Sequence, residues 1–174
     1  MTSPVAKPGQ DPVAQALQRV LAAQHAAIYG YPVIGVALRQ PGQAQLARQL
    51  EAQHRHTRDE LIAQLAARRT TPVPTEAGYA PPRPVTGPVD AQRWALELEQ
   101  GCADAYRYLL VAPVLAARTA IKPATGTPPI SAAEQSALRR QALAGLSGAA
   151  RTATGWRTLL SPASPTVPFP GLAP

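Results

Sequence analysis

Glu51 and His54 stand three residues apart, a spacing that metal chemistry uses. On a helix, residues three apart share a face, so a carboxylate and an imidazole at this spacing can ligate one metal ion. Bundles that hold two metal ions take a Glu-x-x-His pair from each of two helices and one further Glu from each of the other two. Glu51 and His54 are therefore either half of such a site or polar residues that satisfy one another in an apolar core.

The composition predicts that helices position these residues. Alanine occurs 35 times and phenylalanine once, and β-branched residues are too sparse to build a sheet. Hydrophobic periodicity predicts helices over about 11–40, 43–69, 90–118 and 131–160. Asp11 followed by Pro12 is typical of a helix start, and Ser131 with Glu134 forms a capping box.

Proline clusters separate the predicted helices, and the longest cluster lies at 70–88. A connection of this length between the second and third helices is typical of the ferritin-like bundle rather than of the simple up-down-up-down bundle. We therefore predict an all-α fold, a ferritin-like four-helix bundle with a long Pro-rich crossover between helices 2 and 3. The bundle is expected over 11–160, between a flexible N-terminal tail, 1–10, and a Pro-rich C-terminal tail, 161–174.

The inward faces of the predicted helices bring few metal ligands together. The first helix offers Gln24, a neutral amide, and the third offers Glu99. The fourth helix has no Glu-x-x-His pair, and its inward stripe holds Leu, Ala, Gly and Trp. Two divalent ions need about four carboxylates for neutralisation, so the pattern predicts a degenerate di-iron site without a metal cofactor. A single divalent metal on Glu51, His54 and Glu99 is the alternative.

Our preferred interpretation is a polar cluster in the core, in which the groups satisfy one another. A carboxylate buried alone is costly, so Glu99 requires partners. The expected members of this binding cluster are Gln24, Glu51, His54, Arg58 and Glu99, with no catalytic residue among them. His25 and His56 lie about 100° from the inward lines of their helices and are expected at the surface. Cys102, on the inward stripe, is expected to be a small buried hydrophobe.

The remaining composition limits the compartment and the partners. The net charge is +7, but the 15 arginines are scattered and no nucleic-acid-binding module is present, which argues against nucleic-acid binding. One cysteine excludes an internal disulfide, and the N-terminus lacks the apolar run of a signal peptide. No run of eighteen apolar residues occurs, so no membrane span is expected. A cytoplasmic protein is the expectation.

Several segments together resemble a known family. They are residues 23–31, the segment from His54 to Asp59, the Pro-rich segment 70–88 with Tyr79, Leu98 and Glu99 followed by Cys102 and Ala103, and the late Arg151, Trp156 and Arg157. Over about 12–160 the chain is similar to the actinobacterial ferritin-like domains of unknown function. Where that family usually has an acidic residue before the first His, this chain has Gln24. The resemblance implies the fold and an actinobacterial origin, and it supplies no established activity.

The function expected from the sequence is association rather than chemistry. We predict a non-enzymatic bundle that acts through a protein partner or as a homodimer. Small residues on outward faces (Ala22, Ala26, Ala116, Ala117, Ala132, Ala133) allow close approach of a second helix surface. The alternative is a mononuclear metal-dependent or small-molecule-binding enzyme that uses Glu51, His54 and Glu99.

Overall fold

The computed structural model describes residues 11–119 and 130–163, and all regular structure in these ranges is helical. The helices are α1 (Pro12–Ala37), α2 (Pro41–Ala67), α3 (Pro88–Thr119) and α4 (Ala132–Leu160). The described ranges contain no strand, which confirms the all-α class with four helices. The expected tail 1–10, the stretch 120–129 and the tail residues 164–174 lie outside the described residues.

The predicted N-caps of α1 and α4 are present. The Asp11 side chain accepts a hydrogen bond from the Val13 amide at 2.9 Å, and Pro12 takes the first helical position, where its missing N–H costs nothing. Ser131 Oγ accepts from the Glu134 amide at 3.1 Å. These caps explain why both helices begin where the sequence predicts.

Two other boundaries differ from the sequence prediction. Pro41 was expected in the link between the predicted helices 11–40 and 43–69, but it opens α2 after an extended Gln40. The third helix begins at Pro88 rather than at Asp90. Asp90 lies inside the first turn and accepts from Thr86 Oγ1 at 2.6 Å, so its carboxylate caps the start of α3 from within the helix.

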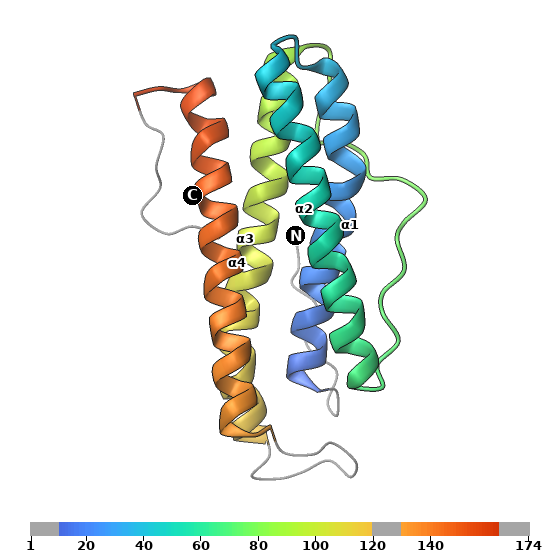
Figure 1. Ribbon diagram of the computed structural model, residues 1–174, viewed down its shortest axis with the longest axis vertical. Helices are drawn as coiled ribbons and strands as arrows, with labels where there is room; N and C mark the ends of the chain where they lie inside the picture. The colour runs from blue at the N-terminus through green and yellow to red at the C-terminus, as the bar shows by residue number, and fades with distance from the viewer. Residues whose placement is uncertain (1–10, 120–129, 164–174) are drawn as a thin grey trace.

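The four helices lie side by side in an up-down-down-up arrangement. Figure 1 shows α1 and α4 rising and α2 and α3 descending along the long axis. The backbone of α1 packs against α2 and α3, and α4 packs against α3. Within the described residues, no close backbone contact joins α4 to α2. Three sides of the bundle are thus closed by helix packing, and the side between α2 and α4 is not.

Residues 68–87, which we call the strap, join the lower end of α2 to the upper end of α3 along the outside of the bundle (Figure 1). The Gln18 side chain of α1 holds the strap with two hydrogen bonds, donating to Thr71 O at 2.6 Å and accepting from the Val73 amide at 2.7 Å. Higher up, the rings of Tyr29 and Tyr79 lie 5.6 Å apart. The strap is thereby fixed to α1, although it has no regular structure.

The buried apolar residues form two clusters, one above the other. The lower cluster contains Leu17 and Leu21 of α1 with Leu109 of α3, and the upper one is built around residues such as Ile34 and Trp156. Of the described helices, only α1 is long and apolar enough to cross a membrane by length and composition. A core helix passes the same test, and the packing of α1 on two neighbours accounts for its apolar character.

Candidate functional site

A polar layer separates the two apolar clusters at the waist of the bundle. It is formed by Gln24 of α1, His54 of α2 and Glu99 of α3, whose residues are 1%, 8% and 2% exposed. The three sit on the apolar stripes of their helices, so the same helical register that builds the core brings them together. The predicted cluster therefore exists in part, with three of its five expected members.

Glu51 and Arg58 do not join this layer, and their expected place in it is corrected. Glu51 is half-buried and its carboxylate accepts from Arg55 Nε at 2.9 Å and from Arg55 Nη2 at 2.6 Å. Arg58 pairs with Asp59 at 2.8 Å. The physical reason is helical register: Glu51 lies about 60° around the helix from His54, and a residue four positions later offers it a surface partner.

One arm of the polar layer leads from Glu99 to α4. The Tyr31 hydroxyl donates to Glu99 Oε1 at 2.5 Å, and Trp156 Nε1–H donates to the Tyr31 oxygen at 3.3 Å. The Tyr31 ring also stacks on the His54 ring, with centroids 5.4 Å apart. The arm connects α1, α3 and α4, and each donor in it has an acceptor.

The other arm leads from His54 to the backbone of α1. His54 Nδ1 lies 2.7 Å from Gln24 Oε1, and Gln24 Nε2 donates to Cys102 Sγ at 3.8 Å. The Cys102 thiol in turn points at Ala23 O, 3.9 Å away. Because an amide oxygen only accepts, His54 Nδ1 carries a proton and the direction of every bond in this arm is fixed.

The two arms meet where His54 Nε2 lies 3.2 Å from Glu99 Oε1. With Nδ1 already protonated, this contact is a hydrogen bond only if one further proton lies on Nε2 or on the carboxyl group. The contact places the imidazole of His54 against the carboxyl group of Glu99, so each of these buried ionisable groups has the other as a partner. A pair of this kind avoids the cost of an uncompensated buried charge.

Burial controls the protonation of the other titratable groups in the layer. Burial raises the pKa of the Tyr31 hydroxyl well above its usual 10.0, and the neighbouring Glu99 adds to the shift. Burial likewise raises the pKa of the Cys102 thiol above 9.0, again with a contribution from Glu99. The Tyr106 pKa is also raised, first by burial and then by Cys102. All three groups remain protonated at neutral pH, and the Tyr31 hydroxyl and the Cys102 thiol serve as hydrogen-bond donors rather than as nucleophiles.

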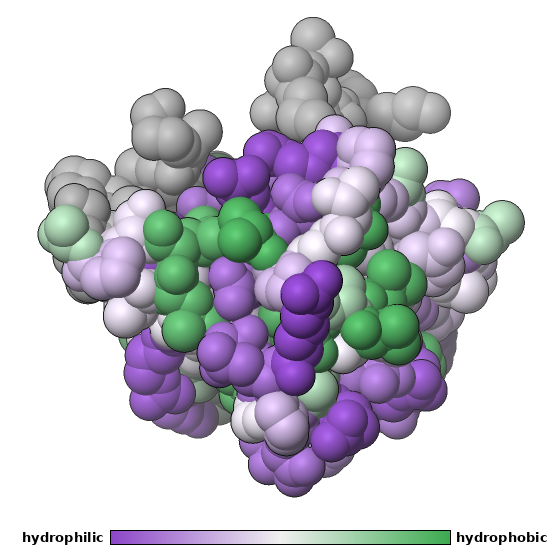
Figure 2. Space-filling model, turned by 90° about the horizontal axis from the view of Figure 1, so that it is seen from above, coloured by the Kyte–Doolittle hydropathy of each residue, from purple (hydrophilic) through white to green (hydrophobic). Residues whose placement is uncertain are grey.

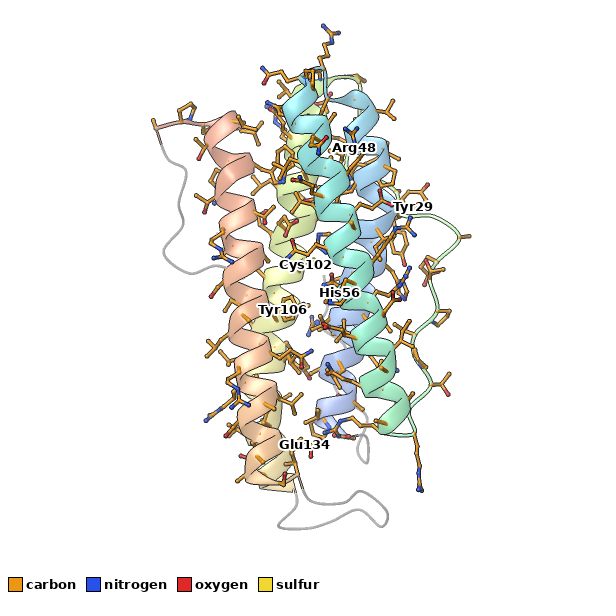
Figure 3. The ribbon with its side chains drawn as sticks, viewed as in Figure 1. Tyr29, Arg48, His56, Cys102, Tyr106 and Glu134 are labelled. Carbon is orange, nitrogen blue, oxygen red and sulfur yellow. The ribbon has the colours of Figure 1, made fainter. Side chains whose placement is uncertain are left out.

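A pocket of about 260 Å³ opens onto this layer on the side between α2 and α4. Gln24, His54, Glu99 and Cys102 contribute to its lining, and α4 supplies residues with small side chains or none (Ala144, Gly145, Gly148, Ala149). Figure 3 shows Cys102 and Tyr106 on α3 in the space that faces α2. We call this feature the waist pocket. Its depth follows from the missing backbone contact between α2 and α4.

Both ends of the open side are fastened by polar contacts. At the lower end, Arg68 at the end of α2 pairs with Asp11 at 2.6 Å and also with Glu134 in the first turn of α4. At the upper end, the hydrogen bond from Trp156 to Tyr31 joins α4 to α1. The waist pocket therefore lies between two points at which α4 is held to the rest of the bundle.

The two other histidines lie away from the pocket. His25 Nε2 is 3.3 Å from Val73 O of the strap, and His56 is exposed and pairs with Glu60 at 3.2 Å. Among the residues that the structure describes, no group of three His, Cys, Asp or Glu side chains is arranged to hold a metal ion. The ligand set of the mononuclear alternative is therefore not assembled, because Glu51 is engaged with Arg55.

Sequence reasoning missed two parts of the site. It did not include Tyr31 or Trp156 in the predicted cluster, although a buried hydroxyl and a buried indole N–H both require partners, and this need was the available signal. It also described the small residues of the fourth helix only as an inward stripe. Gly145 and Gly148, three residues apart on one helix face, indicated a shallow wall that can line a pocket.

Comparison with known proteins gives a family but no activity. The model of a family described as a domain of unknown function (DUF4439) matches residues 16–126. The crystal structure of a conserved hypothetical protein from Mycobacterium tuberculosis is similar over 89% of this chain and 100% of that one, with 32% identity and a TM-score of 0.69. No curated protein matches the chain. A relationship to a family of unknown function is thus confirmed, and neither description mentions a ferritin-like fold.

Proposed function

The chain belongs to the family of the domain of unknown function DUF4439, so its role has to be argued from its own residues, and we propose that it is a binding protein whose waist pocket takes a small molecule. The observation that carries this proposal is a pocket with a buried, hydrogen-bonded polar floor and a largely small-residue wall. Pockets with a few fixed polar groups among apolar lining atoms are typical of small-molecule sites. At about 260 Å³ the pocket suits a small ligand.

The proposal includes a ferritin-like relationship for the bundle. Its support is the course of the chain, in which α2 and α3 run in the same direction and the strap returns along the outside to connect them (Figure 1). Short connections alone would give neighbours in alternating directions, whereas one long connection is typical of ferritin-like bundles. In such bundles the polar layer occupies the position at which facing helices hold metal ions.

The floor of the waist pocket does not fit a dinuclear metal centre. It offers one carboxylate from Glu99, one imidazole from His54 and the amide of Gln24. The polar pocket residues of α4 are Gln141 and Thr152, so that helix brings neither a carboxylate nor an imidazole to the pocket. Two divalent ions at this position would lack the negative charge that neutralises them. We therefore assign no metal-dependent step to this site.

Metal loading tests this part of the proposal. After incubation with iron(II) or manganese(II) and gel filtration, we expect elemental analysis to find no more metal in the protein than in a His54→Gln/Glu99→Gln double variant. Because the double variant lacks both ionisable floor groups, it measures non-specific retention. Two equivalents of tightly held metal per chain would overturn the proposal, and one equivalent would favour the mononuclear alternative.

Self-association remains a second proposal, supported by apolar residues on the outer surface of α1. Val36 is 90% exposed, and Val33, one turn earlier, is 43% exposed. Figure 2, which looks down on the end of the bundle where α1 ends, shows apolar surface in separate groups with polar side chains between them. A homodimer that covers these valines would show in light scattering at micromolar concentration. A monomer under those conditions, unchanged by Val36→Ser, would remove the proposal.

A further inference from the structure

The ionisable lining of the waist pocket differs from the rest of the protein. The chain as a whole has 17 basic and 10 acidic residues, giving +7. The ionisable residues that line the pocket include the carboxylates of Glu60 and Glu99 and the imidazole of His54, and neither lysine nor arginine is among them. A strongly basic protein thus has a pocket with acidic rather than basic lining. An anionic ligand would find no cationic group there apart from His54, which Glu99 already engages.

Glu99 also has an acceptor that the protein leaves unused. The hydrogen bonds from Tyr31 and His54 both go to Oε1. The other oxygen, Oε2, makes no hydrogen bond to the described residues and is not among their fully buried unpaired atoms, so it is open to the pocket that Glu99 lines. A carboxylate oxygen accepts about two hydrogen bonds. Glu99 Oε2 can therefore accept a hydrogen bond from a molecule in the pocket.

The middle of the α4 wall has room for a short carbon chain, whereas Gln53 and Thr57 of α2 make the opposite wall largely polar. Gly148 presents no side chain, and a Cβ placed there would meet no atom within 4 Å. Ala144 and Ala149 add only methyl groups to the same wall, and the Tyr106 side chain also lines the pocket. An aromatic ring near a positively charged group adds to its attraction. The lining thus combines a charged acceptor at the floor with room for a short carbon chain.

We propose that the waist pocket binds a small organic ammonium ion, whose N–H groups donate to Glu99 Oε2 and whose carbon chain lies against α4. The inference rests on the proposed small-molecule function and adds the chemical class of the ligand. A cation satisfies the free acceptor with a charge-assisted hydrogen bond, which is stronger than the bond that a neutral hydroxyl makes. The positive net charge of the chain opposes cation binding elsewhere, so selectivity must come from the pocket.

Three probes with the same carbon chain test the charge of the ligand. Butylammonium, 1-butanol and butyrate are titrated into the full chain at constant ionic strength and followed by protein NMR shifts. We expect butylammonium to bind at least about tenfold more tightly than 1-butanol, which corresponds to about 1.4 kcal/mol. Butyrate is expected not to bind in the pocket. In Glu99→Gln, the preference for the ammonium over the alcohol should be lost.

Two glycines of α4 provide a matched pair that locates the binding. Gly148 lines the pocket, whereas Gly155, seven residues later and on nearly the same helix face, does not. A Cβ at either position meets no atom within 4 Å, so neither substitution clashes where its side chain begins. Gly148→Leu should block the pocket and abolish butylammonium binding, and Gly155→Leu should leave it unchanged. Both substitutions raise helix propensity, so the loss would not reflect unfolding.

The outcomes separate the ligand class from the pocket function. If 1-butanol or butyrate binds as tightly as butylammonium and Gly148→Leu prevents it, the ammonium inference is overturned and the small-molecule function stands. If none of the probes binds, or if binding is unaffected by Gly148→Leu, both the inference and the proposed pocket function are overturned.

Discussion

Replacing Glu99 by alanine is expected to lower the free energy of unfolding by about 3–5 kcal/mol, the cost of breaking a buried charge pair by removing one partner. The Tyr31 hydroxyl and His54 Nε2 both lose their acceptor, and neither can turn to solvent from its buried position. Glu99→Gln keeps an acceptor oxygen for Tyr31, so its cost should be smaller, about 1–2 kcal/mol. Urea unfolding followed by circular dichroism measures both.

Glu51→Ala is the matched control for this result. Both residues are glutamates of the bundle, Glu51 on α2 and Glu99 on α3. They differ in burial, because the Glu51 side chain is 20% exposed against 3% for Glu99, and its partner Arg55 is itself 52% exposed. An exposed i,i+4 pair contributes only about 0.3–0.5 kcal/mol, so removing it should hardly change stability. Equal losses for Glu51→Ala and Glu99→Ala would contradict the placement of the two carboxylates.

The second large effect is expected at Gly145, because the Tyr106 ring of α3 lies directly against its backbone. A Cβ at this position would stand 2.3 Å from two ring atoms of Tyr106, far inside van der Waals contact. The ring, buried between α3 and α4, has to move or the helices have to separate. We expect Gly145→Ala to lower the free energy of unfolding by about 1–3 kcal/mol, as overpacking does. The measurement is again a denaturant titration.

The neighbouring Gly148 distinguishes this clash from a general effect of alanine in α4. A Cβ at Gly148 meets no atom within 4 Å, and Gly148→Ala should stabilise the helix by about 0.5–1 kcal/mol through propensity alone. In a Tyr106→Leu background, which removes the ring, Gly145→Ala should lose most of its cost. A Gly145→Ala variant as stable as Gly148→Ala would show that the two helices pack differently from the structure described above.

Much of the architecture was predictable because its signals are local. Asp11 before Pro12, and Ser131 three residues before Glu134, specify helix starts through hydrogen bonds within one turn. Pro41 was misassigned because a proline after an extended residue is compatible with the end of one helix and with the first position of the next. Local sequence does not distinguish these cases when two helices are separated by only a few residues.

The site was predictable only to the extent that helical register determines it. Gln24, His54 and Glu99 lie on apolar stripes and were placed correctly in the interior. Glu51 lies at the edge of that stripe, so its side chain can face either the core or the surface. It faces the surface because the Arg55 side chain pairs with it there. The waist pocket was not predictable, because it depends on how far α2 and α4 stand apart, and no residue pattern within one helix sets that distance.

The two sides of the waist pocket come from different parts of the chain. The region that matches the family model, 16–126, contains Gln24, His54 and Glu99, and it ends before α4 begins at Ala132. Gln24, His54 and Glu99 thus lie within the region matched by the family model, and α4, which supplies the small-residue wall, follows it. On the proposed binding function, we expect substitutions on the pocket face of α4 to change the size of an accepted molecule while the anchoring groups stay the same.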